Sequence, residues 1–365
     1  MKVLGCLAGV GSMLYEALAQ GDEILGNVES RAIFYNKPWW SLNFGDRPMY
    51  RTVADVPKKV QRAWQDADLA IGHPPCGSHS VLGESKVSKD LHPDERKIRQ
   101  DRRSSRVGLL PEFTDLIQAF TPKLFALDNL PKILKKVATQ EWWETTLPDY
   151  HISTAIITNG HYGCVQIRKR LWIFGTRRDV SRTPFQFRHI VKRPPKAPTT
   201  MLEALTGLSP IPWENDPAFG HIHRPPNEKP IGGFRSGHGK RNVLTDHQSE
   251  VSARYLSQPV KHPWVYETIS TNRETIKVGW LRTNPDGYCS VLSGFPSSQH
   301  PLTGWPLTPR ERARLMGWPD SFKLNAPDDL LDNRGDLWTL TKITGRGVPS
   351  EFVRFLLPQL RTFLK

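Results

Sequence analysis

A cysteine stands directly after a short apolar run, where it could act as a nucleophile. The run Asp68–Gly72 has the pattern of a buried strand, and His73 and two prolines separate it from Cys76. In open α/β folds, ligands and reacting groups collect at the carboxyl ends of strands. A thiolate there can attack a substrate if nearby positive charge lowers its pKa. An inert small apolar side chain is the commoner role of a lone cysteine, but the prolines and the polar residues that follow argue against a core position.

A glycine-containing turn near the start of the chain could bind a nucleotide-like ligand. The segment Leu7–Ser12 lies between a predicted strand and a predicted helix, Met13–Ala19. Glu29 follows about 20 residues on, at the end of the next predicted strand, where an acidic side chain can bind ribose hydroxyls. The chain has no Gly-Lys-Ser/Thr phosphate loop, so the ligand would contain adenosine. A tight turn followed by a solvated glutamate is the alternative interpretation.

These groups need a scaffold that brings strand ends together, and the first half of the chain predicts one. Short apolar β-type runs alternate with helix-like stretches such as Gly108–Phe120, which has apolar residues at helical spacing. The expected strands are Lys2–Leu7, Glu23–Val28, Asp68–Gly72, Leu124–Leu127, Ile152–Thr158 and Leu171–Gly175. This alternation predicts an α/β fold, with a doubly wound, mostly parallel sheet and helices on both faces.

From about Ser181 the sequence changes in character. Proline pairs, the glycine pair Gly232-Gly233 and isolated aromatic residues replace periodic segments as far as about Gly304. That composition predicts a second, loop-rich domain. Apolar residues return at helical spacing after Pro349, so we expect a C-terminal helix that packs on the first domain. The predicted division is a main domain of residues 1–180 plus 339–365 and a smaller domain of residues 181–338.

Charge and composition narrow the class of protein. The 365 residues carry 50 Lys+Arg against 36 Asp+Glu, and the net charge of +14 favours a polyanionic partner. A hydrophobic share of 38% allows real cores and excludes global disorder. No apolar run approaches the roughly 18 residues of a membrane helix, and the start of the chain lacks the layout of a lipoprotein signal. Four scattered cysteines indicate a reducing compartment and no structural metal. We therefore expect a cytoplasmic, monomeric protein without a metal or a membrane anchor.

Taken together, the motifs resemble those of the DNA cytosine-5 methyltransferases, and they follow that family's order over nearly the whole chain. The matching segments are Leu7–Ser12 for the cofactor loop, Pro75-Cys76 for the nucleophile, Asp128–Leu130 for the Glu-Asn-Val motif, Gln166–Arg170 for the Gln-x-Arg-x-Arg motif, and Leu307–Pro319 and Gly345–Pro349 for the last two motifs. Only the target-recognition stretch is unmatched. The resemblance thus implies a Rossmann-like catalytic domain that binds S-adenosylmethionine, with a smaller DNA-binding domain.

The resemblance also implies a specific chemistry. Carbon 5 of cytosine is a poor nucleophile, so the Cys76 thiolate would first add to carbon 6, after which carbon 5 can take the methyl group of S-adenosylmethionine. Asp128 would offset the negative charge at ring nitrogen 3 by hydrogen bonding or protonation. Arg170, with Arg168 behind it, would hold the ring oxygen and lower the thiol pKa, although phosphate binding is an alternative role for both. The target base must leave the duplex to react.

Binding residues follow from the same resemblance. Asp55 would accept the adenine amino group, while Leu109 and Val348 would flank the sulfonium, although a core position suits Leu109 equally well. The implied cofactor-binding residues are Leu7, Ala8, Gly9, Gly11, Ser12, Glu29, Ser30, Asp55, Val56, Pro75, Leu109, Arg346 and Val348. Double-stranded DNA would contact Ser80 and Arg106. Arg235 and Lys240 are further candidate DNA contacts because they are basic residues of the second domain, not because of the resemblance. Arg235 would read a base edge, and a surface loop is its alternative interpretation.

Departures from the family pattern leave alternatives open. Asp128 is one methylene shorter than the family's Glu, Gly77 replaces the usual Gln, and Ser30 stands where an aromatic often stacks on adenine. Arg346 replaces an Asn near the cofactor, and this added cation leaves open an altered S-adenosylmethionine that donates an anionic group. A catalytically inactive, sequence-specific DNA-binding protein is a further alternative, against which the intact Cys76 and the two arginines argue. The recognition sequence depends on the unmatched stretch and is not predicted.

Overall fold

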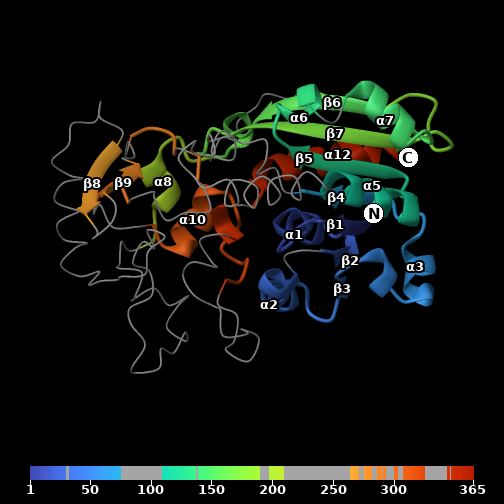
Figure 1. Cartoon of the computed structure of the whole chain (residues 1–365), viewed down its shortest axis with the longest axis horizontal. Helices are drawn as coiled ribbons and strands as arrows, with labels where there is room; N and C mark the ends of the chain where they lie inside the picture. Colours follow the sequence, from blue (N-terminus) through green and yellow to red (C-terminus); the bar gives the residue numbers. More distant parts are fainter. Residues whose placement is uncertain are drawn as a thin grey trace.

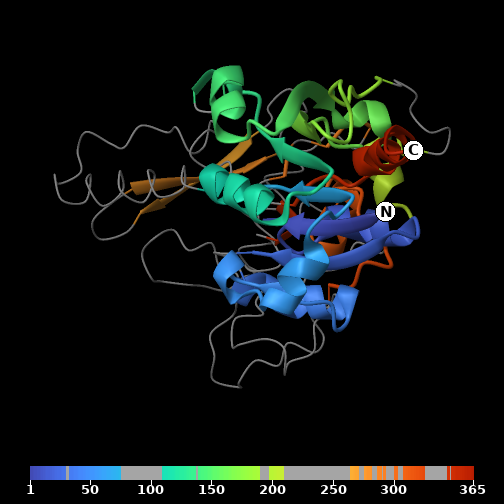
Figure 2. The same cartoon turned by 90° about the vertical axis from the view of Figure 1, so that its right-hand side faces the viewer.

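The protein is described from a computed structural model (Figure 1). The structure describes residues 1–29, 33–74, 109–136, 139–189, 197–208, 264–270, 275–281, 286–289, 291–292, 300–302, 307–324, 343–345 and 347–365. In this part of the chain, a seven-stranded sheet with helices on both faces forms the main body, and a separate two-stranded sheet, β8-β9, lies apart from it (Figures 1 and 2).

Most of the described elements lie in the first 180 residues. In chain order they are β1 (Lys2–Cys6), α1 (Ser12–Ala19), β2 (Glu23–Val28), α2 (Ile33–Phe44), β3 (Met49–Tyr50), η1 (Val53–Asp55), α3 (Lys58–Trp64), β4 (Leu69–Gly72), α5 (Leu109–Phe120), β5 (Leu124–Asn129), α6 (Ile133–Lys136), α7 (Gln140–Thr146), β6 (Tyr150–Thr158), η2 (Asn159–Tyr162), β7 (Lys169–Arg177), α8 (Met201–Leu205), β8 (Trp264–Ser270), β9 (Thr275–Leu281), α10 (Pro309–Leu315) and α12 (Glu351–Phe363).

The sheet order β3-β2-β1-β4-β5-β7-β6 contains a topological switch point. The chain runs outward from β1 to β2 and β3, and then crosses back to place β4 on the other side of β1. The five neighbouring strands β3, β2, β1, β4 and β5 are parallel to one another. Strand β7 lies between β5 and β6 and is antiparallel to both. Open α/β sheets bind ligands at the carboxyl ends of the strands beside such a reversal. The doubly wound, mostly parallel fold predicted from the sequence is confirmed.

Alternate residues of the strands pack into two hydrophobic cores, one on each face of the sheet. Val3 and Leu124 point to the face covered by α1, α2 and α12, whereas Leu4 and Phe125 point to the face covered by α3 and α5 (Figures 1 and 2). This alternation is the period-two pattern of a strand buried on both faces.

The C-terminal helix α12 packs on α1, so segments from the two ends of the chain lie side by side (Figure 1). Phe352, Leu356 and Leu360 enter the same core as Leu14. Ion pairs border this contact: Arg354 Nη2 lies 2.9 Å from Glu16 Oε1, and Arg361 Nη2 lies 2.6 Å from Asp22 Oδ2. The prediction of a C-terminal helix that docks on the first domain agrees with this packing.

A third core joins the later segments to the loop after β1. Met201, Leu315 and Trp318 pack in one cluster with Val10 and Trp39, and the Trp39 indole donates to the Leu324 carbonyl at 2.7 Å. The predicted division of the chain at residues 181 and 339 stays a prediction.

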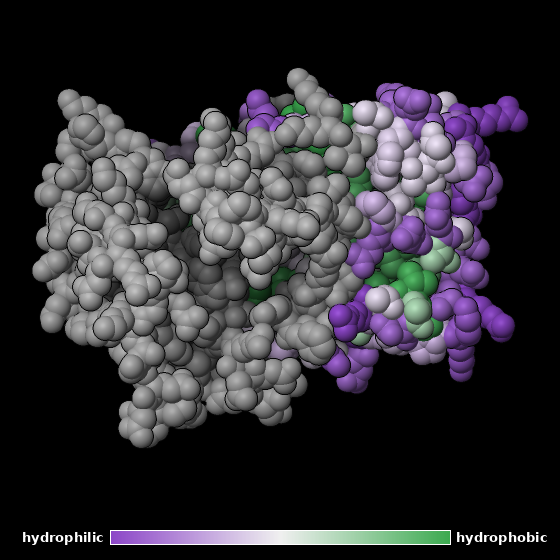
Figure 3. Space-filling view, in the orientation of Figure 1, coloured by the Kyte–Doolittle hydropathy of each residue, from purple (hydrophilic) through white to green (hydrophobic). Residues whose placement is uncertain are grey.

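None of the described helices is long and apolar enough to cross a membrane. Hydrophilic side chains cover most of the described surface visible in Figure 3.

Candidate active site

The turn after β1 adopts backbone conformations that favour glycine. Leu7, Gly9 and Gly11 have φ values of 58°, 63° and 86°. A Cβ on Gly11 would lie 2.6 Å from Phe44 Cε2, so the site has no room for a side chain. A Cβ on Gly9, in contrast, would meet no atom within 4 Å. The turn is therefore packed tightly on its helix side and open at Gly9, where a ligand could approach the backbone.

Glu29 is bound to this turn from the end of β2. The Gly9 N–H donates to Glu29 Oε2 at 2.7 Å, and Asn27 Nδ2 donates to the Gly9 carbonyl at 3.2 Å. Burial raises the pKa of the Glu29 carboxyl to about 7; the Gly9 hydrogen bond opposes the rise and Glu112 adds to it. Near neutral pH, Glu29 is therefore balanced between its protonated and ionised forms.

Of the other predicted cofactor-binding residues, Val348 and Val56 lie beside the same turn. The Ser12 hydroxyl donates to the Val348 carbonyl at 3.4 Å, and the Trp318 indole donates to the same oxygen at 3.1 Å. Val56 shares a core with Leu7. Asp55 is exposed, and its Oδ2 accepts hydrogen bonds of 2.9 Å from the Thr52 N–H and hydroxyl, where it caps a short helix. Leu109 is the first residue of α5. Ser30, Pro75 and Arg346 lie outside the described residues.

A buried cluster of His73, Asp128 and Arg170 lies at the neighbouring strand ends. His73 follows β4 and Asp128 belongs to the end of β5, while Arg170 comes from the start of β7. Because β7 is antiparallel, its start lies at the edge where β4 and β5 end. Arg170 Nη2 donates to Asp128 Oδ2 at 2.6 Å, and Arg170 Nε lies 3.0 Å from both carboxylate oxygens. His73 Nδ1 lies 3.0 Å from Asp128 Oδ2.

Electrostatics fix the charge of each member of this cluster. Burial would raise the pKa of Asp128, but the Arg170 guanidinium and His73 outweigh burial and bring it to about 2. Burial lowers the pKa of His73; the hydrogen bond to Asp128 opposes this, and the Arg170 and Arg168 charges add to it. The site thus combines a carboxylate, a guanidinium and a neutral imidazole at neutral pH. Such a set can offer both donors and an acceptor to a polar ring.

Arg168 connects the cluster with the last motifs of the chain. Its Nη1 donates to the Gly347 carbonyl at 3.4 Å and lies 4.0 Å from Met316 Sδ. Gln166 Nε2 also reaches Met316 Sδ, at 3.2 Å. These contacts bring the Gln166–Arg170 segment beside the backbone that leads to Val348 and hence to the turn after β1.

The structure brings three of the four predicted catalytic residues, Asp128, Arg168 and Arg170, to one edge of the sheet. The fourth, Cys76, lies outside the described residues. So do the predicted DNA contacts Ser80, Arg106, Arg235 and Lys240. His73 was not predicted as a site residue, although it directly precedes the Pro-Pro-Cys segment. A single histidine after a strand has no spacing partner in the sequence, so only the contact with Asp128 reveals it.

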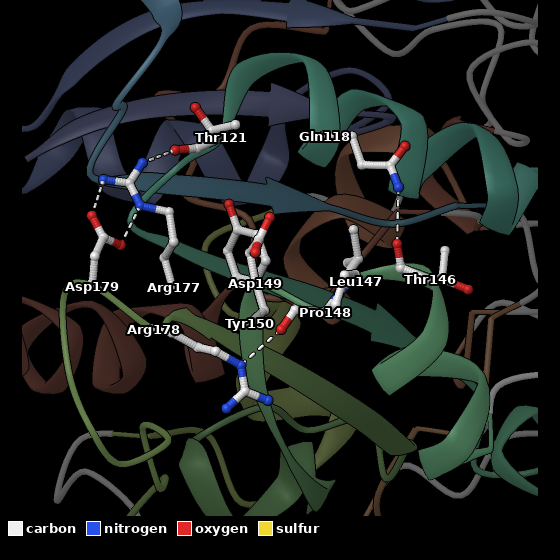
Figure 4. A pocket seen from close by; sticks show the side chains of 10 residues that line it. All are labelled: Gln118, Thr121, Thr146, Leu147, Pro148, Asp149, Tyr150, Arg177, Arg178 and Asp179. Carbon is white, nitrogen blue, oxygen red and sulfur yellow. Dashed lines mark hydrogen bonds and ion pairs between the residues drawn. The ribbon is translucent and has the colours of Figure 1, made fainter.

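A pocket of about 610 Å³ lies at the opposite edge of the sheet (Figure 4). Its polar groups bind one another: Gln118 Nε2 donates to the Thr146 carbonyl at 2.8 Å, and Arg177 Nε donates to Asp179 Oδ1 at 2.7 Å. This edge holds the amino ends of the parallel strands, away from the switch point.

Within the described part of the chain, no group of three His, Cys, Asp or Glu side chains could hold a metal ion. The cluster and the turn after β1 are therefore the better site.

Comparisons with known proteins agree on one family. A family model described as C-5 cytosine-specific DNA methylase matches residues 8–361. The type II methyltransferase M1.ScrFI of Lactococcus lactis subsp. cremoris is 24% identical over 339 residues, covering 90% of this chain and 72% of the relative. The type II methyltransferase M.DdeI of Desulfomicrobium norvegicum is also 24% identical, covering 88% of this chain and 79% of the relative.

Solved structures share the fold. A structure described as a DNA modification methyltransferase encoded within an E. coli prophage has a TM-score of 0.66 and 22% identity, covering 100% of this chain and 99% of its own. The S. pombe Dnmt2 methyltransferase has a TM-score of 0.55 and 14% identity, covering 99% of both chains. At these identities, the likeness supports the Rossmann-like fold alone.

Proposed function

Because the chain belongs to the C-5 cytosine-specific DNA methylase family and is a DNA cytosine-5 methyltransferase, we propose that it methylates a flipped-out cytosine in double-stranded DNA through a covalent Cys76 adduct. The observation that best supports this chemistry is the cluster of Asp128, Arg170 and His73 at the switch-point edge. It places fixed donors and an acceptor beside the strand that leads to Cys76. S-adenosylmethionine is the proposed methyl donor.

The turn after β1 fits an adenosine-containing cofactor. The open space at Gly9 leaves the backbone accessible, and the Glu29 carboxyl lies 2.7 Å from the Gly9 nitrogen. In the proposed complex, Glu29 accepts hydrogen bonds from the ribose hydroxyls. Val348, whose carbonyl accepts from the Ser12 hydroxyl, flanks the sulfonium. When bound, S-adenosylmethionine supplies a methyl group activated by the positive charge on its sulfur.

The proposed reaction assigns each step to residues of this chain. The Cys76 thiolate donates its electron pair to carbon 6 of the cytosine, and the ring electrons move toward carbon 5 and ring nitrogen 3. The positive charges of Arg170 and Arg168 stabilise that negative charge electrostatically. Asp128 was expected to act at ring nitrogen 3; in this proposal it is instead a buried carboxylate that contacts Arg170 and His73 and keeps Arg170 in place. After methyl transfer, carbon 5 loses its proton to water, and Cys76 leaves as a thiolate.

Mass spectrometry of nucleosides tests this function. Plasmid DNA incubated with the protein and S-adenosylmethionine should yield 5-methylcytosine, and sequencing of the methylated positions should give the recognition sequence. DNA without protein, and protein with S-adenosylhomocysteine, are the controls. The same incubation is repeated with a cell extract as the source of the donor. A group larger than methyl on carbon 5 in that sample would support the alternative of an altered S-adenosylmethionine. Sequence-specific binding without any cytosine modification would contradict the enzyme assignment.

Glu29 makes cofactor binding depend on pH. An ionised carboxylate accepts hydrogen bonds about twice as strongly as a neutral group. Because the pKa of Glu29 is about 7, the affinity for S-adenosylhomocysteine should rise as the pH increases from 6 to 8. Glu29→Gln should remove this pH dependence and weaken binding at pH 8 by ~1–3 kcal/mol. Isothermal titration calorimetry at several pH values measures both effects.

The matched control for this prediction is Glu23→Gln. Glu23 is exposed at the first position of the same strand, β2. Its variant should retain the wild-type affinity and pH dependence. A pH-dependent affinity that persists in Glu29→Gln would mean that another group is responsible.

Binding to DNA completes the proposal. The net charge of +14 supports a polyanionic substrate, and Ser80, Arg106, Arg235 and Lys240 are the proposed contacts. The protein would act as a monomer in the cytoplasm of a bacterial or phage-infected cell. The curated relatives are type II methyltransferases, which supports a role in restriction protection; phage DNA modification and regulation are the alternatives.

A further inference from the structure

We propose that His73 recognises the target cytosine by accepting a hydrogen bond from the exocyclic amino group at its Nε2 atom, while Asp128 holds the imidazole in orientation. This inference rests on the proposed function and deepens it. It adds a residue that selects the target base, outside the motifs that carry the family resemblance.

The tautomer of His73 follows from its neighbours. Nδ1 lies 3.0 Å from Asp128 Oδ2 and 3.1 Å from the Asp128 carbonyl oxygen. Both atoms are acceptors, and the Asp128 carboxyl is ionised, so Nδ1 carries the ring proton. In a neutral imidazole, Nε2 then has a lone pair and can only accept. The lowered pKa of His73, caused first by burial, keeps the ring neutral at neutral pH.

Arg170 leaves this lone pair accessible. Arg170 Nη2 lies 3.2 Å from Nδ1 and 3.4 Å from Nε2. Because the two distances are nearly equal, Nη2 faces the ring between the nitrogens and not along the lone-pair direction of Nε2. The same nitrogen already donates to Asp128 Oδ2 at 2.6 Å.

Exposure selects His73 as the member of the cluster that a base can touch. The side chains of Asp128 and Arg170 are 0% exposed, whereas that of His73 is 14% exposed. Both carboxylate oxygens of Asp128 are committed to Arg170 and His73. Asp128 therefore acts through its two partners, and His73 is the partly exposed member of the cluster, at the end of β4.

An acceptor at this place distinguishes cytosine from other pyrimidines. Cytosine carries an N4 amino donor where thymine carries the O4 acceptor. The Nε2 lone pair would attract the former and repel the latter. A site built to bind a substrate N–H group rejects analogues that lack it, because the buried polar atom is left unpaired.

A thermodynamic cycle tests the contact. Two duplexes carry the recognition sequence, one with cytosine and one with 2-pyrimidinone, which lacks the amino group, at the target position. Binding is measured by fluorescence anisotropy with S-adenosylhomocysteine present, for the wild type and for His73→Phe. Both proteins bind the same two duplexes, so differences in the ease of base extrusion cancel. The preference of the wild type for cytosine over the analogue should fall roughly 10- to 100-fold in His73→Phe.

Controls separate this contact from a structural effect. His151→Phe, a change on β6 beside Arg178, should keep the wild-type preference. His73→Gln has an amide oxygen that can accept from the amino group, and it should recover part of the preference even if His73→Phe fails to fold. An unchanged preference in folded His73→Phe or a complete loss in folded His73→Gln would overturn the inference. A wild type that forms no 5-methylcytosine would instead overturn the proposed function.

Discussion

Cys76→Ser is expected to abolish methyl transfer and leave DNA affinity nearly unchanged. The proposed reaction needs an anion that adds to carbon 6, and a serine hydroxyl does not ionise near neutral pH as a thiol does. Loss of a covalent nucleophile costs roughly 1000-fold or more in rate. Transfer of isotope-labelled methyl groups to a duplex measures the rate, and fluorescence anisotropy measures the affinity. Turnover near that of the wild type would refute the role of Cys76.

The adduct itself can be trapped. Once S-adenosylmethionine has methylated carbon 5 of a 5-fluorocytosine at the target position, that carbon has no proton to lose and Cys76 cannot leave, so the wild type with S-adenosylmethionine should form a complex that survives denaturation. Cys76→Ser should form none. Cys289→Ala is a suitable control, because burial raises the pKa of this thiol to about 12 and makes it unreactive. This variant should trap DNA as the wild type does, provided that it folds.

The second large effect expected is on stability. Asp128→Asn should lower the free energy of unfolding by ~3–5 kcal/mol, because it leaves the buried Arg170 guanidinium without its carboxylate. Asp128 and Arg170 are both fully buried, and two donor atoms of Arg170 contact the carboxylate. Urea unfolding at pH 7 measures the difference between wild type and variant.

The dependence of this effect on pH has a definite sign. The pKa of Asp128 is about 2, below the value of roughly 4 for an unfolded aspartate. The stabilisation is therefore complete above about pH 4, and it is lost as the pH falls toward 2. The difference between wild type and Asp128→Asn should shrink over that range and stay constant from pH 6 to 8.

Asp179→Asn provides the matched control on the same sheet. Asp179 pairs with Arg177 at 2.7 Å, but its side chain is 65% exposed. Solvent screening makes such an exposed pair contribute much less than a buried one. If Asp128→Asn costs no more than Asp179→Asn, the buried pair does not stabilise the fold.

Strands with a strong pattern were predictable, and short or irregular elements were not. The predicted strands Asp68–Gly72 and Leu124–Leu127 recur as β4 and β5, because strands buried on both faces are continuous apolar runs. β3 has only two residues and leaves no pattern. α2 contains Pro38 in its interior, and its apolar residues do not gather on one face. Neither feature predicts a helix.

The site was predictable in residue types but not in its pairing. Asp128 and Arg170 were assigned by resemblance, but their ion pair depends on β7 returning antiparallel between β5 and β6. Nothing in the spacing of apolar residues determines that insertion. His73 escaped prediction for a similar reason, because its partner Asp128 is 55 positions away in the sequence.

The packing of α12 on α1 has a consequence for synthesis on the ribosome. Glu16 and Arg354 are 338 positions apart, so at roughly 5–20 residues per second α1 emerges on the order of 20–70 s before its partner helix. During that time the nascent sheet lacks one of the helices that cover its face, and apolar side chains such as Leu14 stay accessible to water and to chaperones. The packing of α1 therefore stays incomplete until α12 has been synthesised.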